Sequence, residues 1–251
     1  MPASWAVSRN LHNAQRLIIP ISEERRRMEI INDPDYKPIN DFPQWLMDEA
    51  WNERDGQPAE LVHRLLVLRL ASVHTTSITA TQVLYDIIAH PKYLEPLREE
   101  TLQALKEDGG WQKTTLTKMR KPDSFMKESQ RLNGPSLIGF KRAAMEDIKL
   151  SDRTILPKGV HMGQKPGQSN LHQFAMTDKN NMHFGHGKYS CPGRFLAAHT
   201  IKILIAHLIL NYDSEFPEGK SRPGNLLAHE CCFPDPTARI LMKERESPWS
   251  I

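Results

Sequence analysis

Residues 183–195 read HFGHGKYSCPGRF, and this stretch predicts both the chemistry and the fold of the chain. Gly185 and Gly187 allow tight backbone turns and the close approach of a flat ligand. Cys191 follows these glycines, and a helix is predicted to begin near Arg194. A thiolate just before a helix start is stabilised by the partial positive charge and the free amides there. A sulfur in this position can therefore act as an anionic metal ligand.

A single cysteine is more often a small buried apolar residue than a ligand, and the surrounding pattern decides between the two interpretations. The loop matches the haem-binding signature of the cytochrome P450 family at every spacing, through Phe184, Gly187, Cys191 and Gly193. Pro192 and Arg194 complete the Cys-Pro-Gly-Arg form that is common in fungal members. The chain thus resembles a fungal-type cytochrome P450 from about residue 16 to residue 245.

The resemblance implies a haem b cofactor whose iron is bound by the thiolate of Cys191. An axial thiolate directs electron density onto the iron and favours cleavage of the O–O bond. By the same resemblance, Phe184 packs near the sulfur and His186 contacts a haem propionate. Gly187, Gly193 and Arg194 belong to the same cofactor-binding loop.

Glu128 and Arg131 form a second motif on a predicted helix, in the sequence KESQR. Taken alone, an i,i+3 pair of this kind is usually a surface ion pair worth a few tenths of a kcal/mol. The pair matches the Glu-x-x-Arg motif of the family. The resemblance implies a buried pair that fixes the core on the haem side.

Residues 71–76, ASVHTT, form a third motif in the middle of a long predicted helix. In the family this helix passes over the haem, and Thr75 would support protonation of the oxygen bound at the iron. His74 stands where the family usually has an acid, and it could act in the proton relay because imidazole titrates near neutral pH. A histidine satisfied in the core is an equally good interpretation of His74. Thr75 can also bond back to a carbonyl of the preceding turn.

The periodicity predicts a mainly α protein with minor β-structure. The resemblance implies a partial cytochrome P450 fold, with helices around the haem-binding cysteine loop and a minor β-sheet. It is expected to form a single truncated domain over residues 1–251. Short strands and turns are predicted over 136–160, and a loop over 164–181. Helices are predicted over 11–31, 42–52, 59–90, 93–107, 116–132 and 195–211.

Composition sets outer limits on the function. The chain has 251 residues, a net charge of +3 and no long basic block, which argues against nucleic-acid binding. Three cysteines do not suggest a disulfide framework, so a reducing compartment is expected. The best apolar stretch, 201–210, is too short to span a bilayer. The expected location is therefore intracellular, without a transmembrane anchor in this chain. The resemblance implies a cytoplasmic protein or one peripheral at the endoplasmic reticulum membrane, where family members are anchored.

The sequence also departs from the family. Typical members are about twice as long, and their membrane anchor, first helices and first sheet have no counterpart here. In the family, a strand, a helix and a Pro-x-Arg-Phe element follow the Pro-Lys-Gly turn at 157–159. Here only residues 160–183 intervene before Phe184, with a predicted join near 164–167. The Glu128–Arg131 pair would then lack its third partner, which is costly for a buried pair.

The resemblance implies a monooxygenase that inserts one oxygen atom into a C–H bond of a small hydrophobic substrate. Electrons would come from NADPH through a separate NADPH–cytochrome P450 reductase, and fungal secondary metabolism, terpenoid or alkaloid, is the expected setting. Leu137, Ile138 and Phe140 are candidate pocket residues, and core packing explains them equally well. One alternative is a truncated, catalytically inactive remnant or binding module. Another is a helical protein in which Cys191 is merely structural.

Overall fold

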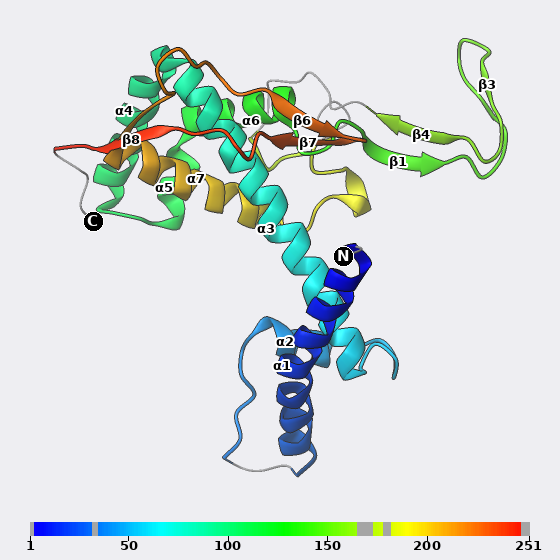
Figure 1. Ribbon diagram of the computed structural model, residues 1–251. Coiled ribbons are helices and arrows are strands. Elements are labelled where there is room, and N and C mark those ends of the chain that lie inside the picture. The colour runs from blue at the N-terminus through cyan, green and yellow to red at the C-terminus, as the bar shows by residue number, and fades with distance from the viewer. Residues whose placement is uncertain (1–2, 32–34, 165–172, 178–181, 247–251) are drawn as a thin grey trace. The chain divides into compact units, whose positions relative to one another are not determined.

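The computed structural model describes residues 3–31, 35–164, 173–177 and 182–246 (Figure 1). The chain forms two compact units, residues 1–74 and 75–251. Helix α3 (Pro58–Ala89) runs through the boundary between them.

The first unit contains α1 (Ala3–Ile31), α2 (Phe42–Asp48) and the start of α3. Asp41 caps α2, because its side chain accepts a hydrogen bond from the backbone N–H of Gln44 at 3.0 Å. The two oxygens of the same carboxylate accept hydrogen bonds from the two Nη atoms of Arg25, each at 2.7 Å. The helix predicted over 59–90 is confirmed to within one residue at each end. The helix predicted over 11–31 is correct in type and at its end, but it begins eight residues earlier, at Ala3. The prediction over 42–52 is correct in type but four residues too long.

In its described residues, the second unit contains the rest of α3 and four further α-helices. These are α4 (Leu94–Asp108), α5 (Lys113–Lys118), α6 (Arg120–Asn133) and α7 (Arg194–Asn211). Two short 3₁₀ turns, η1 (Pro91–Tyr93) and η2 (Gly187–Tyr189), precede α4 and α7. The helices predicted over 93–107 and 195–211 are confirmed to within one residue at each end.

The single helix predicted over 116–132 is wrong, because the structure has two helices there. Met119 leaves the helical region, with φ −73° and ψ 75°, and separates α5 from α6. Pro122 supplies the physical reason, since its missing N–H breaks the hydrogen-bond ladder in a helix interior. A new helix that starts at Arg120 places Pro122 in the first turn, where that N–H is not needed.

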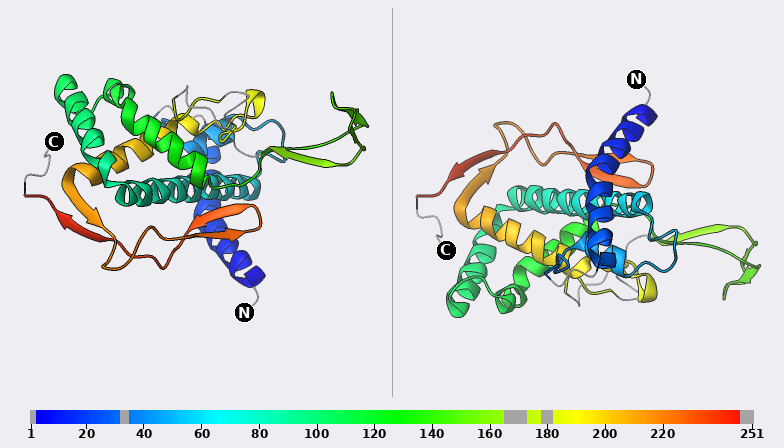
Figure 2. Two further views of the ribbon diagram at one scale, coloured as in Figure 1. Left: turned by 90° about the horizontal axis from the view of Figure 1, so that it is seen from above. Right: turned by 90° about the horizontal axis from the view of Figure 1, so that it is seen from below.

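The strands form four two-stranded antiparallel sheets in the described residues, which confirms the predicted minor β-structure. The β1–β4 hairpin extends away from the helices of its unit (Figure 2). The four pairs are β1 (Gly139–Ala143) with β4 (His161–Gln164), β2 (Ile148–Lys149) with β3 (Ile155–Leu156), β5 (Tyr212–Glu215) with β8 (Leu241–Glu244), and β6 (Asn225–Ala228) with β7 (Cys231–Pro234).

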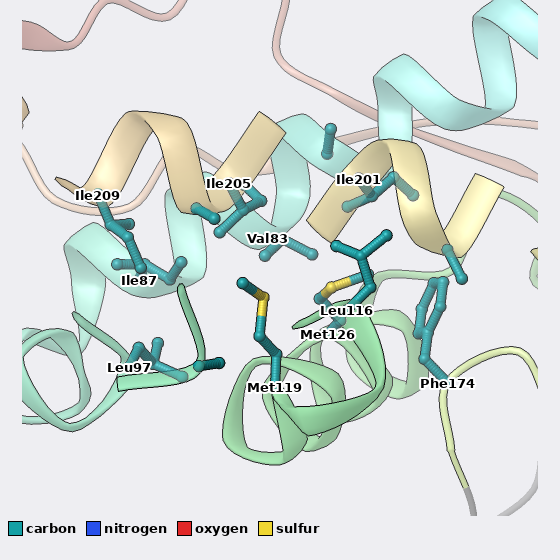
Figure 3. Close-up of a cluster of buried hydrophobic side chains, with 14 of the residues drawn as sticks. Val83, Ile87, Leu97, Leu116, Met119, Met126, Phe174, Ile201, Ile205 and Ile209 are labelled. Carbon is teal, nitrogen blue, oxygen red and sulfur yellow. The ribbon is translucent and has the colours of Figure 1, made fainter. Parts of the chain in front are cut away.

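The core of the second unit lies between α3, α4, α6 and α7 (Figure 3). Val83 of α3 and Met126 of α6 face a stripe on α7 that repeats every four residues, which places its members on one helix face. The stripe consists of Ile201, Ile205 and Ile209, each at most 3% exposed. Burial of such side chains is worth about 1.5–3 kcal/mol each and fixes α7 beneath α3.

Within the described residues, α7 is the one helix long and apolar enough to cross a membrane by length and composition. It begins at Arg194 and has 18 residues, so the apolar segment is longer than the stretch 201–210 considered in the sequence. Its isoleucine stripe lies in the core. The packing therefore identifies α7 as the core helix of this unit.

Arg98 of α4 secures the far end of α7. Its side chain is 6% exposed, and the guanidinium donates to the backbone carbonyls of Ile209 at 2.6 Å and Tyr212 at 3.0 Å. It also pairs with Glu95 and Asp213, each at 2.6 Å. The last carbonyls of a helix have no partner within the helix, so Arg98 satisfies groups that burial would leave unpaired.

Candidate functional site

The cysteine loop is held in shape by its own backbone. The N–H of Cys191 donates to the carbonyl oxygen of Phe184 at 2.7 Å, which closes the loop. Gly185 has φ +72°, and a Cβ atom there would lie 2.5 Å from the carbonyl oxygen of Tyr189. Gly187 has φ +61°. Both positions therefore require glycine, as the sequence predicted.

Cys191 lies directly before α7. Gly193 is the N-cap residue of α7, and no side chain caps the helix start. The Nη1 atom of Arg194 donates to the carbonyl oxygen of Cys191 at 2.9 Å. The thiol of Cys191 is free and half-buried, so it is chemically available at the end of the loop.

An aromatic contact packs against the cysteine loop. The ring of Phe184 meets the ring of Phe174 edge to face, with centroids 5.3 Å apart and an interplanar angle of 87°. Phe174 is fully buried, and its backbone N–H donates to Oδ2 of Asp123 at 2.6 Å. Asp123 also pairs with Lys202 of α7 at 2.6 Å. Sequence reasoning did not find these three residues, although a lysine inside an apolar helix was a usable signal.

The cysteine loop and α3 line one cavity of about 290 Å³. Thr75 and Cys191 both belong to its wall, so the structure brings these two predicted site residues together. Phe184 lines the same cavity. The full set of lining residues is Thr75, Thr76, Thr79, Gln130, Pro135, His183, Phe184, Gly185, Tyr189, Cys191, Ala197 and Ile201.

Several predicted site residues do not line this cavity. His74 is exposed and lies in the first unit, on the other side of the boundary from Thr75. His186, Gly187, Gly193 and Arg194 belong to the cysteine loop but are outside the cavity wall. The back-bonding considered for Thr75 stays a prediction. The neighbouring Thr79 bonds in this way, since its hydroxyl donates to the Thr75 carbonyl at 2.9 Å.

His183 is a cavity residue that sequence reasoning did not select. Burial, reinforced by the positive charges of Lys127 and Arg131, lowers the pKa of its imidazole from 6.5 to about 4. The cavity wall therefore carries a neutral imidazole at neutral pH. His183 directly precedes Phe184 and is therefore part of the cysteine loop.

The Glu128–Arg131 ion pair forms, but it is not buried as the resemblance implied. Two hydrogen bonds of 2.6 and 2.7 Å join the guanidinium to the carboxylate. The side chains are 47% and 33% exposed. The bond to Arg131 lowers the pKa of Glu128. No third charged partner of this pair occurs among the described residues, and an exposed pair is worth about 0–1 kcal/mol.

A larger cavity, of about 730 Å³, lies between α4 and α6. Glu128 and Phe125 are among its lining residues, but Cys191 is not. We place the candidate site in the smaller cavity because it contains the free thiol. Leu137 and Ile138 line neither cavity and are about 40% exposed. The side chain of Phe140 and the predicted join at 165–167 lie outside the described residues.

The residues present fit a haem. No group of three or more metal-ligating side chains occurs in the described part of the chain. A single thiolate such as Cys191 suits a metal that brings its other ligands with it, as haem iron does. In the same loop, Nδ1 of His186 is buried without a hydrogen-bond partner. A polar group of a bound cofactor would satisfy that atom, since buried polar atoms are rarely left unpaired.

A mainly helical unit with a free cysteine directly before a core helix is compatible with the class of haem-thiolate proteins, and comparison with known proteins identifies the family. The family model described as Cytochrome P450 matches residues 7–165. The chain belongs to the cytochrome P450 family. This confirms the resemblance inferred from the motifs, although the match ends before the cysteine loop.

Curated relatives extend the similarity to nearly the whole chain. Cytochrome P450 monooxygenase AN1598 from Emericella nidulans is 51% identical over 98% of this chain and 51% of its own length. Cytochrome P450 monooxygenase olcJ from Penicillium canescens is 47% identical over the same shares. Cytochrome P450 monooxygenase paxP from Penicillium paxilli is 38% identical over 98% of this chain and 53% of its own. The chain spans about half the length of these relatives.

The alignment with AN1598 runs over 273 positions and is therefore longer than the 251-residue chain itself. That relative has positions within the aligned region that lack a counterpart here. A gap of this kind is what the sequence predicted between the turn at 157–159 and Phe184. Its location remains a prediction.

Proposed function

We propose that this chain supplies the haem-thiolate site of a monooxygenase that oxidises a small hydrophobic molecule. The observation that carries the proposal is the shared cavity, which is lined both by Cys191 and by the hydroxyl-bearing residues Thr75, Thr76 and Thr79 of α3. When bound, a haem with a thiolate ligand supplies oxygen activation. The relatives' names, all cytochrome P450 monooxygenases, support the same reaction class.

Each residue of the site has a distinct task in this proposal. Cys191 binds the iron, and Phe184, packed on Phe174, keeps water from the sulfur. His186 donates or accepts a hydrogen bond at the cofactor edge through its unpaired Nδ1. Thr75 presents a hydroxyl on the α3 side of the cavity, where it can hold a proton or a water molecule.

The partners and setting follow from the family. We include in the proposal a separate NADPH–cytochrome P450 reductase as electron donor, an intracellular location at or near the endoplasmic reticulum, and a role in secondary metabolism. Support comes from the fungal sources of the relatives. The sequence also shows no flavin- or nicotinamide-binding motif of its own.

The test is the absorption spectrum of the reduced, carbon-monoxide-bound protein after expression with haem. We expect a strongly red-shifted Soret band from thiolate-ligated haem. Cys191→Ala should remove this band, whereas Cys231→Ala should keep it, because Cys231 lies in β7 outside the cavity. A red-shifted band that persists in Cys191→Ala would refute the assignment of the iron ligand.

A second candidate function is a catalytically inactive remnant or binding module. It is favoured by the exposed Glu128–Arg131 pair, which has no third charged partner in the described residues. Absence of stoichiometric haem uptake by a folded chain would support this candidate over the monooxygenase.

A further inference from the structure

A buried ion pair lies beneath the candidate site. Asp123 of α6 and Lys202 of α7 are each 7% exposed, and Oδ1 of the carboxylate is 2.6 Å from Nζ of the lysine. The ammonium group also donates to the carbonyl oxygen of Leu116 at 2.8 Å. One cation thus joins α5, α6 and α7. Desolvating such a pair is costly and often adds no net stability, so its presence calls for another explanation.

The second oxygen of the same carboxylate faces the cysteine loop. Oδ2 of Asp123 accepts the backbone N–H of Phe174 at 2.6 Å. Residues 173–177 form neither helix nor strand, so their position depends on contacts of this kind. The ring of Phe174 lies against Phe184, and the Phe184 carbonyl accepts the N–H of Cys191. A continuous path of close contacts therefore runs from the buried ion pair to the backbone of Cys191.

We propose that Asp123 and Phe174 are positioning residues that hold the Cys191 thiol in the orientation that iron ligation needs. The inference rests on the proposed function, because it assigns these residues a purpose at that site. The carboxylate is suited to this task because each of its oxygens has a different partner. Oδ1 pairs with Lys202, and Oδ2 accepts the hydrogen bond from the Phe174 amide. Lys202 fixes the carboxylate itself, since a paired buried charge has little freedom to move.

Two variants test the proposal without leaving a lone buried charge. The double substitution Asp123→Leu with Lys202→Met removes both charges, which proteins often tolerate, and deprives the Phe174 amide of its acceptor. Phe174→Leu removes the ring contact with Phe184 and leaves the ion pair intact. The matched control is Asp213→Asn, which removes a carboxylate bonded at 2.6 Å to a core cation elsewhere in the same unit.

The first readout is the alkylation rate of Cys191 relative to Cys231 in the same molecules, measured by mass spectrometry without haem. We expect the alkylation ratio of Cys191 to Cys231 to rise roughly three- to tenfold in both test variants. Each variant loses one hydrogen bond or ring contact that opposes opening of the loop, and a loss of that size gives a change of this order. The control should leave the ratio unchanged. The second readout is the fraction of haem with the red-shifted carbon-monoxide band, which should fall in both test variants.

An unchanged alkylation ratio in both test variants would overturn the proposal. So would an equal rise in Asp213→Asn, because that result would show general loosening of the unit. The thiol measurement needs no haem, so it separates this inference from the proposed function. Failure of haem binding with a raised ratio would refute the monooxygenase but leave the contact path to Cys191 supported.

Discussion

The neutral state of His183 makes the stability of the protein depend on pH in a predictable way. Burial and the charges of Lys127 and Arg131 lower the pKa of the folded imidazole to about 4, whereas the unfolded chain returns it to about 6.5. Between these values the unfolded state binds more protons than the folded state. The free energy of unfolding must therefore fall as pH falls through this window.

The size of the effect follows from the two pKa values. At about pH 7 both states are mostly deprotonated, and the contribution is close to zero. At about pH 5 the unfolded imidazole is mostly protonated and the folded imidazole is not, so His183 alone lowers the free energy of unfolding by about 2 kcal/mol. That is a sizeable part of the roughly 5–15 kcal/mol that stabilises a typical domain.

Urea unfolding followed by far-UV circular dichroism, at a series of pH values from 7 to 5, measures this contribution. The glutamine in His183→Gln does not titrate. The free energy of unfolding of this variant should therefore fall by about 2 kcal/mol less than that of the wild-type chain between pH 7 and pH 5. Arg131→Gln should reduce the pH dependence only slightly, because burial is the largest cause of the shift. Parallel pH profiles for the wild type and His183→Gln would refute a depressed pKa at this position.

Two further substitution pairs test the packing around the site. Arg98→Met should lower the free energy of unfolding by about 3–5 kcal/mol, because it leaves buried carbonyls unpaired. Arg245→Met removes the more exposed partner of the same Asp213 and should lower the free energy of unfolding by at most about 1 kcal/mol. Equal losses in chemical denaturation would show that the carbonyls are not the decisive partners. Gly185→Ala should cost about 3 kcal/mol or more and reduce haem uptake, because positive φ and a backbone clash act together. Gly187→Ala meets open space and should cost only about 1–2 kcal/mol, so similar melting temperatures for the two variants would contradict the clash.

Much of the fold and part of the site could be predicted from local sequence. Pro91 ends α3 where expected, and Gly109, at φ +66°, ends α4 because few other residues adopt that conformation. The tight turns of the cysteine loop could also be predicted from the sequence, because the shape of the loop depends on contacts within a dozen residues. The break at Met119 was missed because the apolar periodicity continues across it while the hydrogen-bond ladder does not.

The sequence by itself therefore determined the family and the helical class, and it singled out Cys191 as the candidate iron ligand, because each of these rests on short-range spacing and backbone sterics. Only the tertiary structure decided which side chains surround that thiol. Asp123 meets Phe174 across 51 positions, and the lysine partner of Asp123 lies on another helix. Burial of His183 and exposure of the Glu128–Arg131 pair likewise depend on how helices pack. Such contacts join segments far apart in the chain, and no periodicity in the sequence records them.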